Sequence, residues 1–238
     1  MGQGLPTHVH KELIVLYLIT SDAHFRHDNV IRFERKCFDS VEAHDGRLLP
    51  LWREWLSGLS ENDTFYFLGD LCGKGQEECV VRDILAGAFS LTPAKKVMIK
   101  GNHDKRTPNS LLEEVFDQVY DYPVYISDRV VLSHYPCAVY PSQVNVHGHT
   151  HGMRLKDMNH ICASVHVNKY RPVTSKDVER RLGRCATWDT RFLYEPWAVD
   201  YQVTQERTDI ITDSDNVIDL SASRLYHELR KIDRYSAE

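Results

Sequence analysis

Five short segments of the chain carry side chains that can bind divalent metal ions. Aspartate and asparagine supply oxygen ligands and histidine supplies nitrogen ligands, a set that suits Mn²⁺, Fe, Zn²⁺ and related borderline ions. In chain order the segments are Ser21-Asp22-Ala23-His24, Leu68-Gly69-Asp70, Gly101-Asn102-His103-Asp104, Leu132-Ser133-His134 and His147-Gly148-His149-Thr150-His151. Two of them end runs of aliphatic and β-branched residues that have the length of buried strands. Ligands at strand ends are held stiffly, so the pattern predicts a metal centre.

The segments that lead into the first three motifs predict alternating strands and helices. The apolar run at residues 13–19 has the length of a buried strand and ends just before Asp22. Further strands are predicted at 64–68 and 96–100, and helices at 28–36, 40–58 and 76–87. Ser40 is a candidate cap for the second helix. This order predicts β-α-β units with the chemistry at the carboxyl ends of the strands.

A second sheet is predicted further along the chain. After a short helix near 109–117, strand patterns occupy residues 118–122, 124–126, 130–133 and 144–147. Prolines and a Ser127-Asp128 turn separate them.

The spacing within two ligand pairs is also informative. One residue separates Asp22 from His24, and Thr150 separates His149 from His151. On an extended backbone this spacing places both members of a pair on the same side, whereas a helix would separate them. We therefore expect extended backbone at both pairs.

Composition limits the class of protein. A chain of 238 residues with a net charge of −5 and many charges of both signs indicates a soluble protein without a global basic field for nucleic acid. The longest apolar stretch, residues 13–19, is too short for a membrane span and lacks the features of a signal peptide. Six cysteines lie singly with no C-x-x-C pair, which favours reduced thiols. The sequence therefore predicts a cytoplasmic protein.

The last part of the chain differs from the rest. Residues 205–215 are polar and acidic, and only 220–232 carry a loose apolar stripe of helical spacing. We therefore divide the chain into a core domain at residues 1–182 and a C-terminal extension at residues 183–238, whose role the sequence leaves open.

The order of the motifs, D-x-H, G-D, G-N-H-D, H and G-H-x-H, resembles that of the calcineurin-like metallophosphoesterases over roughly residues 13 to 182. The resemblance is strongest to a small bacterial and phage subfamily of predicted phosphoesterases. Its local signatures are similar to Ser21-Asp22-Ala23-His24-Phe25 with His27 and Asn29, to Leu132-Ser133-His134-Tyr135-Pro136 and to Asn168-Lys169-Tyr170-Arg171-Pro172-Val173. The family implies an α/β (α+β) fold: two mixed β-sheets packed as a sandwich, flanked by helices, with a dimetal site at the strand carboxyl ends.

The resemblance also implies a set of ligands and a mechanism. Two divalent ions and a metal-bridging hydroxide would hydrolyse a phosphoester. Asp70 would be the carboxylate shared by both ions. The other ligands would be Asp22, His24 and His151 for one ion, and Asn102, His134 and His149 for the other. Mn²⁺ is the ion we expect to support activity, with Fe, Zn²⁺, Ni²⁺ and Co²⁺ left open.

His103 is expected next to the metals but not among their ligands. It would donate a proton to the leaving group or stabilise the transition state, and Asp104 would orient it. Further candidates for substrate contact are Asn102, His27, Asn29, Lys74 and Arg106. Helix capping is the alternative for His27 and Asn29, and simple solvation is the alternative for Lys74 and Arg106. His147 is expected to be a structural histidine behind the ligands.

One departure from the broader family bears on the substrate. Protein phosphatases carry an acidic residue three positions after the bridging aspartate and an arginine one further on, whereas this chain has Gly73 and Lys74. Lysine does not reproduce the bidentate grip of arginine on phosphate. A phosphodiesterase that acts on a nucleotide-like or small phosphodiester substrate is therefore favoured. The alternatives are a nuclease acting on DNA or RNA ends, a phosphomonoesterase and a metal-retaining scaffold protein. No membrane partner is expected, and the oligomeric state is open.

Overall fold

A five-stranded mixed sheet forms one half of the molecule in this computed structural model, which describes residues 16–33, 35, 37–89, 92–152, 154–155, 158–185 and 217–218. Its strands, in spatial order, are β10 (Val173–Thr174), β1 (Tyr17–Thr20), β2 (Thr64–Phe67), β3 (Lys95–Ile99) and β4 (Gln118–Tyr120). Strands β1 to β4 are parallel, and β10 adds to β1 in the antiparallel sense. The four parallel strands therefore direct their carboxyl ends to one edge.

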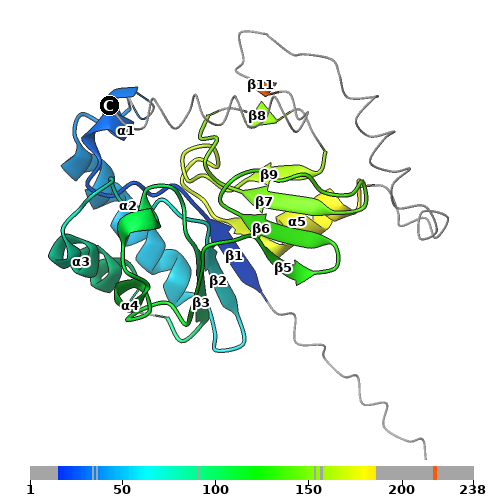
Figure 1. Cartoon of the computed structure of the whole chain (residues 1–238), viewed down its shortest axis with the longest axis horizontal. Coiled ribbons are helices and arrows are strands. Elements are labelled where there is room, and N and C mark those ends of the chain that lie inside the picture. Colours follow the sequence, from blue (N-terminus) through cyan, green and yellow to red (C-terminus); the bar gives the residue numbers. More distant parts are fainter. Residues whose placement is uncertain are drawn as a thin grey trace, which may run out of the picture.

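A second mixed sheet lies beside the first (Figure 1). Its order is β5 (Val124–Ser127), β6 (Val130–Ser133), β7 (Val144–His147) and β9 (His160–Cys162). Strands β6, β7 and β9 are parallel, and β5 is antiparallel to β6. A short pair joins β8 (Arg154–Leu155) to β11 (Val217–Ile218). The two mixed sheets with flanking helices confirm the predicted fold class.

The first sheet is buried on both faces because its strands are apolar at consecutive positions. Successive side chains point to opposite faces of a strand. Leu18, Phe67 and Met98 accordingly pack in the cluster under the helices, whereas Ile19 and Ile99 pack in a second cluster with residues of the other sheet. This second cluster is the core of the sandwich and fixes the two sets of strand ends relative to each other.

Helices cover the other face of the first sheet. They are α2 (Val41–Ser57), α3 (Glu78–Phe89) and the short α4 (Asn109–Leu112), and Figure 1 shows them on the side away from the second sheet. Ser40 caps α2, because its hydroxyl accepts a hydrogen bond from the Ala43 amide at 3.2 Å. Trp52 of α2 is fully buried among the rings of Phe25, Phe65, Phe67 and Phe89. The remaining helices are α1 (Asp28–Phe33), α5 (Ser175–Leu182) and the 3-10 turn η1 (Asp104–Arg106).

Several sequence expectations need correction. The strand predicted at 118–122 joins the first sheet as β4, not the second, because the chain after β3 crosses through η1 and α4 and returns parallel to β3. The helix predicted at 109–117 is only the single turn of α4. Strands β9 and β10 are too short to show a pattern. Residues 13–15 of the first predicted strand and the helix predicted at 220–232 lie outside the described residues. Among the helices of the described part, none has the length and apolar character needed to cross a bilayer.

Candidate metal centre

The five motifs meet at the carboxyl ends of strands from both sheets. Asp22 and His24 follow β1, Asp70 follows β2, and Asn102 and His103 follow β3. His134 follows β6 in the second sheet, and His149 and His151 follow β7. All these side chains are buried, with at most 8 % of any residue exposed. The sandwich thus brings together donors that are separated by more than a hundred positions in the chain.

One group of donors consists of Asp22, His24, Asp70 and His151, whose ligand atoms all lie within 4.8 Å of one another. The Nε2 atoms of His24 and His151 are 3.1 Å apart. The Nε2 atom of His24 lies 3.5 Å from Oδ2 of Asp70, and that of His151 lies 3.5 Å from Oδ1 of Asp22. Four donors therefore surround one point.

A second group contains Asp70, His134 and His149, again within 4.8 Å. Oδ1 of Asn102 extends it, at 2.9 Å from Nε2 of His134 and 3.0 Å from Nδ1 of His149. Nε2 of His134 is 3.5 Å from Oδ1 of Asp70. Asp70 therefore belongs to both groups and turns a different carboxylate oxygen toward each.

The donor spacing fits divalent cations. Two ligands that bind one ion at about 2.1 Å and at right angles lie about 3.0 Å apart. The contacts among His134, Asn102 and His149 span 2.9 to 3.2 Å, and the contact between His24 and His151 is 3.1 Å. Such distances among nitrogen and oxygen lone pairs are repulsive without a proton or a cation between them.

The electrostatics of the protein alone also favour a cation. Burial and then the neighbouring carboxylates of Asp104 and Asp22 raise the pKa of Asp70 well above its usual value. Burial and then the imidazole of His151 lower the pKa of His24 well below its usual value. The histidine is thus in the neutral form that binds metals, whereas the raised pKa of Asp70 shows that the protein alone does not supply enough positive charge to keep this carboxylate ionised.

Hydrogen bonds behind the donors set the orientation of two histidines. Nδ1 of His134 donates to the carbonyl of Leu68 at 2.7 Å, which leaves the lone pair of Nε2 directed into the second group. Nδ1 of His24 lies 3.1 Å from Nδ1 of His27, so its Nε2 faces the first group. The ring of His27 thus contacts the site, and its centre is 5.0 Å from that of His103.

The backbone at the ligands is left-handed, which corrects the expectation of extended chain. Positive φ angles occur at five of the candidate ligands, namely Asp22 (54°), His24 (49°), Asp70 (59°), His149 (65°) and His151 (46°). Non-glycine residues seldom adopt this conformation, and it persists where the surrounding structure enforces it, often at functional sites. His149 and His151 lie in different groups of donors, whereas Asp22 and His24 lie in the same one.

Two glycines of the motifs allow backbone to approach the donors closely. A Cβ atom at Gly101 would lie 2.1 Å from Oδ1 of Asp70, and one at Gly148 would lie 2.7 Å from Oδ2 of Asp22. Neither contact is possible in a real structure, so any larger residue would displace a ligand.

Asp104 supports the site in a way the sequence did not predict. We expected it to orient His103, but its carboxylate instead accepts hydrogen bonds from the backbone amides of Asp70 (2.6 Å), Leu71 (3.0 Å) and Gly101 (2.9 Å). The 3-10 turn that begins at Asp104 points the side chain back toward the ends of β2 and β3. A buried carboxylate needs such donors, and here they tie two ligand loops together.

His103 lies against both groups of donors but has a different environment. Its backbone amide donates to Oδ1 of Asp70 at 2.9 Å, and its ring packs edge-on against His24 at 4.7 Å. Within the described residues neither ring nitrogen has a hydrogen-bond partner, although the side chain is fully buried. Burial, and then the neighbouring His27 and Lys74, lower the pKa of His103 to about 2. The imidazole is therefore neutral before substrate binds.

The other sequence candidates divide into two sets. Lys74 and Arg106 line a cleft of about 380 Å³ together with Asn102 and His103. Asn29 is half-buried in α1 and does not line this cleft.

His147 is also separate from the donors. It is buried at the end of β7, where its Nδ1 atom lies 2.8 Å from the carbonyl of Gly148.

A buried polar network behind Asp22 carries no sequence motif. The guanidinium of Arg35, which is 1 % exposed, donates to the carbonyls of Asp22 and Ala23. It also lies 2.6 Å from Nε2 of His44, whose Nδ1 is 2.9 Å from Asp45. Arg35 thus supplies hydrogen-bond donors to the two backbone carbonyls that lie between the candidate ligands Asp22 and His24, both of which have left-handed backbone.

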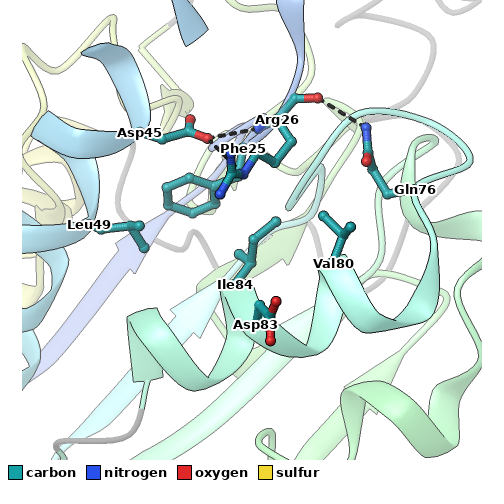
Figure 2. A pocket seen from close by; sticks show the side chains of 8 residues that line it. All are labelled: Phe25, Arg26, Asp45, Leu49, Gln76, Val80, Asp83 and Ile84. Atoms are coloured by element: carbon teal, nitrogen blue, oxygen red, sulfur yellow. Dashed lines mark hydrogen bonds and ion pairs between the residues drawn. The ribbon is translucent and has the colours of Figure 1, made fainter. Parts of the chain in front are cut away.

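The network ends at the surface in the pocket of Figure 2. There Oδ2 of Asp45 accepts a hydrogen bond from the Arg26 amide at 3.0 Å, and the carbonyl of Arg26 accepts one from Gln76 at 3.0 Å. The pocket, of about 400 Å³, lies between α2 and α3 and has Phe25 and Ile84 among its apolar lining residues. It is distinct from the cleft at His103.

Two of the candidate groups of donors share a carboxylate at the strand ends of a mixed two-sheet sandwich, an arrangement that suits a dinuclear metallohydrolase. The profile of the calcineurin-like phosphoesterases matches residues 16–202, so the chain belongs to this family. The family depends on two metal ions, and the protein is accordingly a metal-dependent phosphoester hydrolase.

Individual proteins are also similar to this chain. The uncharacterized protein MJ1445 of Methanocaldococcus jannaschii is 30% identical over 169 residues, which cover 67% of this chain and 86% of the relative. The protein of unknown function AQ665 from Aquifex aeolicus has a crystal structure with a TM-score of 0.52 and 25% identity, covering 70% of this chain and 98% of that one. The nuclease MPE of Pseudomonas putida is 21% identical, with a TM-score of 0.40 over 59% of this chain and 64% of the nuclease. This last likeness is too distant to indicate a substrate.

Proposed function

We propose that the protein is a phosphodiesterase that uses two divalent ions to hydrolyse a nucleotide-like or other small phosphodiester. The observation that carries the proposal is the placement of Asp70, whose Oδ2 faces His24 and whose Oδ1 faces His134, each at 3.5 Å. A carboxylate that serves two groups of donors is the arrangement that a pair of adjacent ions requires.

The ligand roles follow from the two groups. Asp22, His24 and His151 would hold one ion with Oδ2 of Asp70. Asn102, His134 and His149 would hold the other ion with Oδ1, and Asn102 would also contact the substrate. When bound, the two ions supply Lewis-acid polarisation of the phosphoryl oxygen and activation of the attacking water. We expect Mn²⁺ to serve, with Fe, Zn²⁺, Ni²⁺ and Co²⁺ as alternatives.

His103 would act as a hydrogen-bond donor to the phosphate oxygens. Its ring nitrogens have no hydrogen-bond partner among the described residues, which supports a role as donors to a substrate. The low pKa of about 2 favours the neutral imidazole, which donates a hydrogen bond without transferring a proton. Of the two roles considered from the sequence, stabilisation of the transition state is therefore preferred over general acid catalysis. Asp104 would position the loops of Asp70 and His103.

The preference for diesters depends on Lys74. It stands where the protein phosphatases have arginine, and it lines the cleft at His103. A lysine offers a point charge instead of a bidentate fork, which suits the single charge of a diester better than the dianion of a phosphoprotein. We further propose that residues 1–182 form the catalytic domain and that the protein works in the reducing cytoplasm, as its single cysteines suggest.

A substrate panel tests the proposal. Protein dialysed against EDTA should lose phosphoester hydrolysis and regain it with Mn²⁺, because no side chain in the site is a credible nucleophile without metal. In the Mn²⁺ form, bis-p-nitrophenyl phosphate or a cyclic nucleotide should have a higher kcat/KM than p-nitrophenyl phosphate or a phosphoserine peptide. Full activity in excess EDTA would refute the mechanism. A preference for the phosphopeptide would refute diester specificity, and cleavage confined to oligonucleotide ends would favour the nuclease alternative.

A further inference from the structure

A basic cleft opens directly beside the metal centre. It measures about 380 Å³ and is lined by Lys74, Gly75, Asn102, His103, Lys105 and Arg106. The two buried residues, Asn102 and His103, form its inner wall next to the donors, and the three cationic side chains are exposed. None of the lining residues is acidic. Three positive charges therefore surround a space that begins where the scissile phosphate would bind.

The cations of this cleft have no hydrogen-bond or ion-pair partner in the described part of the chain. Lys74, Lys105 and Arg106 make no hydrogen bond or ion pair with another described residue, in contrast to Arg82, which pairs with Glu114 at 2.7 Å. The ring of His103, buried and without a hydrogen-bond partner in the described part of the chain, faces the same space. A site with unsatisfied donors and uncompensated positive charge is suited to an anion.

The walls of the cleft are fixed to the metal centre. Lys105 and Arg106 belong to η1, and the first residue of that turn, Asp104, accepts the backbone amides of Asp70 and Gly101. The backbone that carries these cations is therefore tied to the loop of the shared carboxylate. An anion in the cleft would be held at a set distance from the reacting phosphate.

We propose that this cleft binds a second phosphate group of the substrate, so that the enzyme acts on organic phosphoesters that carry another phosphate close to the scissile one. This inference rests on the proposed function. The cleft is small, none of its lining residues is Phe, Tyr or Trp, and the chain has a net charge of −5. These features favour a small phosphodiester that carries a second phosphate group, such as a cyclic nucleotide with a further phosphate, over a nucleic-acid strand.

The test compares ligands that differ by one phosphate. AMP, ADP and adenosine 3′,5′-bisphosphate compete with bis-p-nitrophenyl phosphate in the Mn²⁺ form of the full chain, and calorimetric titration gives their dissociation constants independently of turnover. At least one of the two doubly phosphorylated nucleotides, ADP or adenosine 3′,5′-bisphosphate, should bind about tenfold more tightly than AMP. This is the size expected for one charge-assisted contact. The advantage should shrink at high salt because the cations are exposed.

Substitutions assign the effect to the cleft. K105M and R106M should each reduce the ratio of the AMP dissociation constant to the bisphosphate dissociation constant toward one, because neither residue is assigned to the scissile phosphate. The matched control is K95M, since Lys95 is an exposed lysine at the opposite end of β3. The ratio should be the same in K95M as in the unsubstituted protein.

The outcomes separate this inference from the proposed function. If no phosphoester is hydrolysed with Mn²⁺, the proposed function fails. If bis-p-nitrophenyl phosphate is hydrolysed but neither doubly phosphorylated nucleotide binds more tightly than AMP, or the advantage survives in both K105M and R106M, the second-phosphate site is wrong. Affinity that rises with each nucleotide added to an oligonucleotide would show a strand-binding groove and would also overturn it.

Discussion

The carboxylate of Asp104 accepts the backbone amide of Asp70 at 2.6 Å and so fixes the residue that both groups of metal donors share. The same oxygen accepts the Gly101 amide at 2.9 Å. The ends of β2 and β3 are thereby joined by one buried side chain, directly behind the site.

Replacing Asp104 by asparagine should destabilise the protein and loosen the metal centre. The amide group would turn an N–H toward backbone amides that need an acceptor, at a cost of about 2–4 kcal/mol in the free energy of unfolding. Urea unfolding measures this cost, and elemental analysis should show less metal per chain. Asp83→Asn is the control, because Asp83 is exposed. Equal stability of D104N and the unsubstituted protein would show that these hydrogen bonds contribute little.

Asp70→Asn should lower metal content at both sites, whereas His24→Ala should chiefly empty one. An amide offers a single neutral oxygen in place of two anionic ones, and only Asp70 lies in both groups of donors. Elemental analysis after dialysis against a limiting amount of Mn²⁺ distinguishes the two variants. Two ions retained in D70N would exclude the bridging role.

His103→Ala should leave both ions bound but slow hydrolysis by about 10²-fold, the usual effect of losing one transition-state hydrogen bond. Because the pKa of His103 is low, at about 2, the loss should be similar for p-nitrophenolate and for an alkoxide leaving group. Steady-state kinetics with both substrates provide the comparison. A much larger loss with the alkoxide would instead assign proton donation to His103.

Arg35→Met should weaken the first group of donors more than the second. Methionine fills much of the space but leaves the carbonyls of Asp22 and Ala23 without their donor, at a cost of about 2–4 kcal/mol. Thermal unfolding and the metal content per chain report the two effects. Arg53→Met, at an exposed arginine that donates to the Gly87 carbonyl, should have a small effect on both. Comparable losses in the two variants would contradict a special role for Arg35.

Tyr17 should make stability fall at alkaline pH. Burial and then the neighbouring Glu179 raise its pKa from 10.0 to about 12 in the folded protein. The folded state thus holds the phenol proton more tightly than the unfolded state. The stability this contributes is present below about pH 10 and is lost as the pH rises toward 12. Tyr17→Phe should make the urea-unfolding free energy less dependent on pH in this range, whereas Tyr122→Phe, at an exposed tyrosine, should not.

The local sequence was sufficient to predict the donors and the elements that carry them. The apolar runs before Asp22 and Asp70 predict strands, and the polar residues that follow them mark the strand ends where ligands gather. The Ser40 cap and the helix after it were also predictable, because capping and amphipathic spacing act over a few residues. The family resemblance then supplied the division of the donors between two ions.

Only the tertiary structure decided how these residues meet. Positive φ angles occur at His149 and His151, although their spacing predicted extended backbone. The carboxylate of Asp104 accepts a hydrogen bond from the backbone amide of Asp70, and the guanidinium of Arg35 donates one to the carbonyl of Asp22. No sequence motif indicates the role of Arg35. Such contacts join residues far apart in sequence or depend on strained φ angles, and the packing of the two sheets enforces them. The conformational propensities of short segments do not predict that packing.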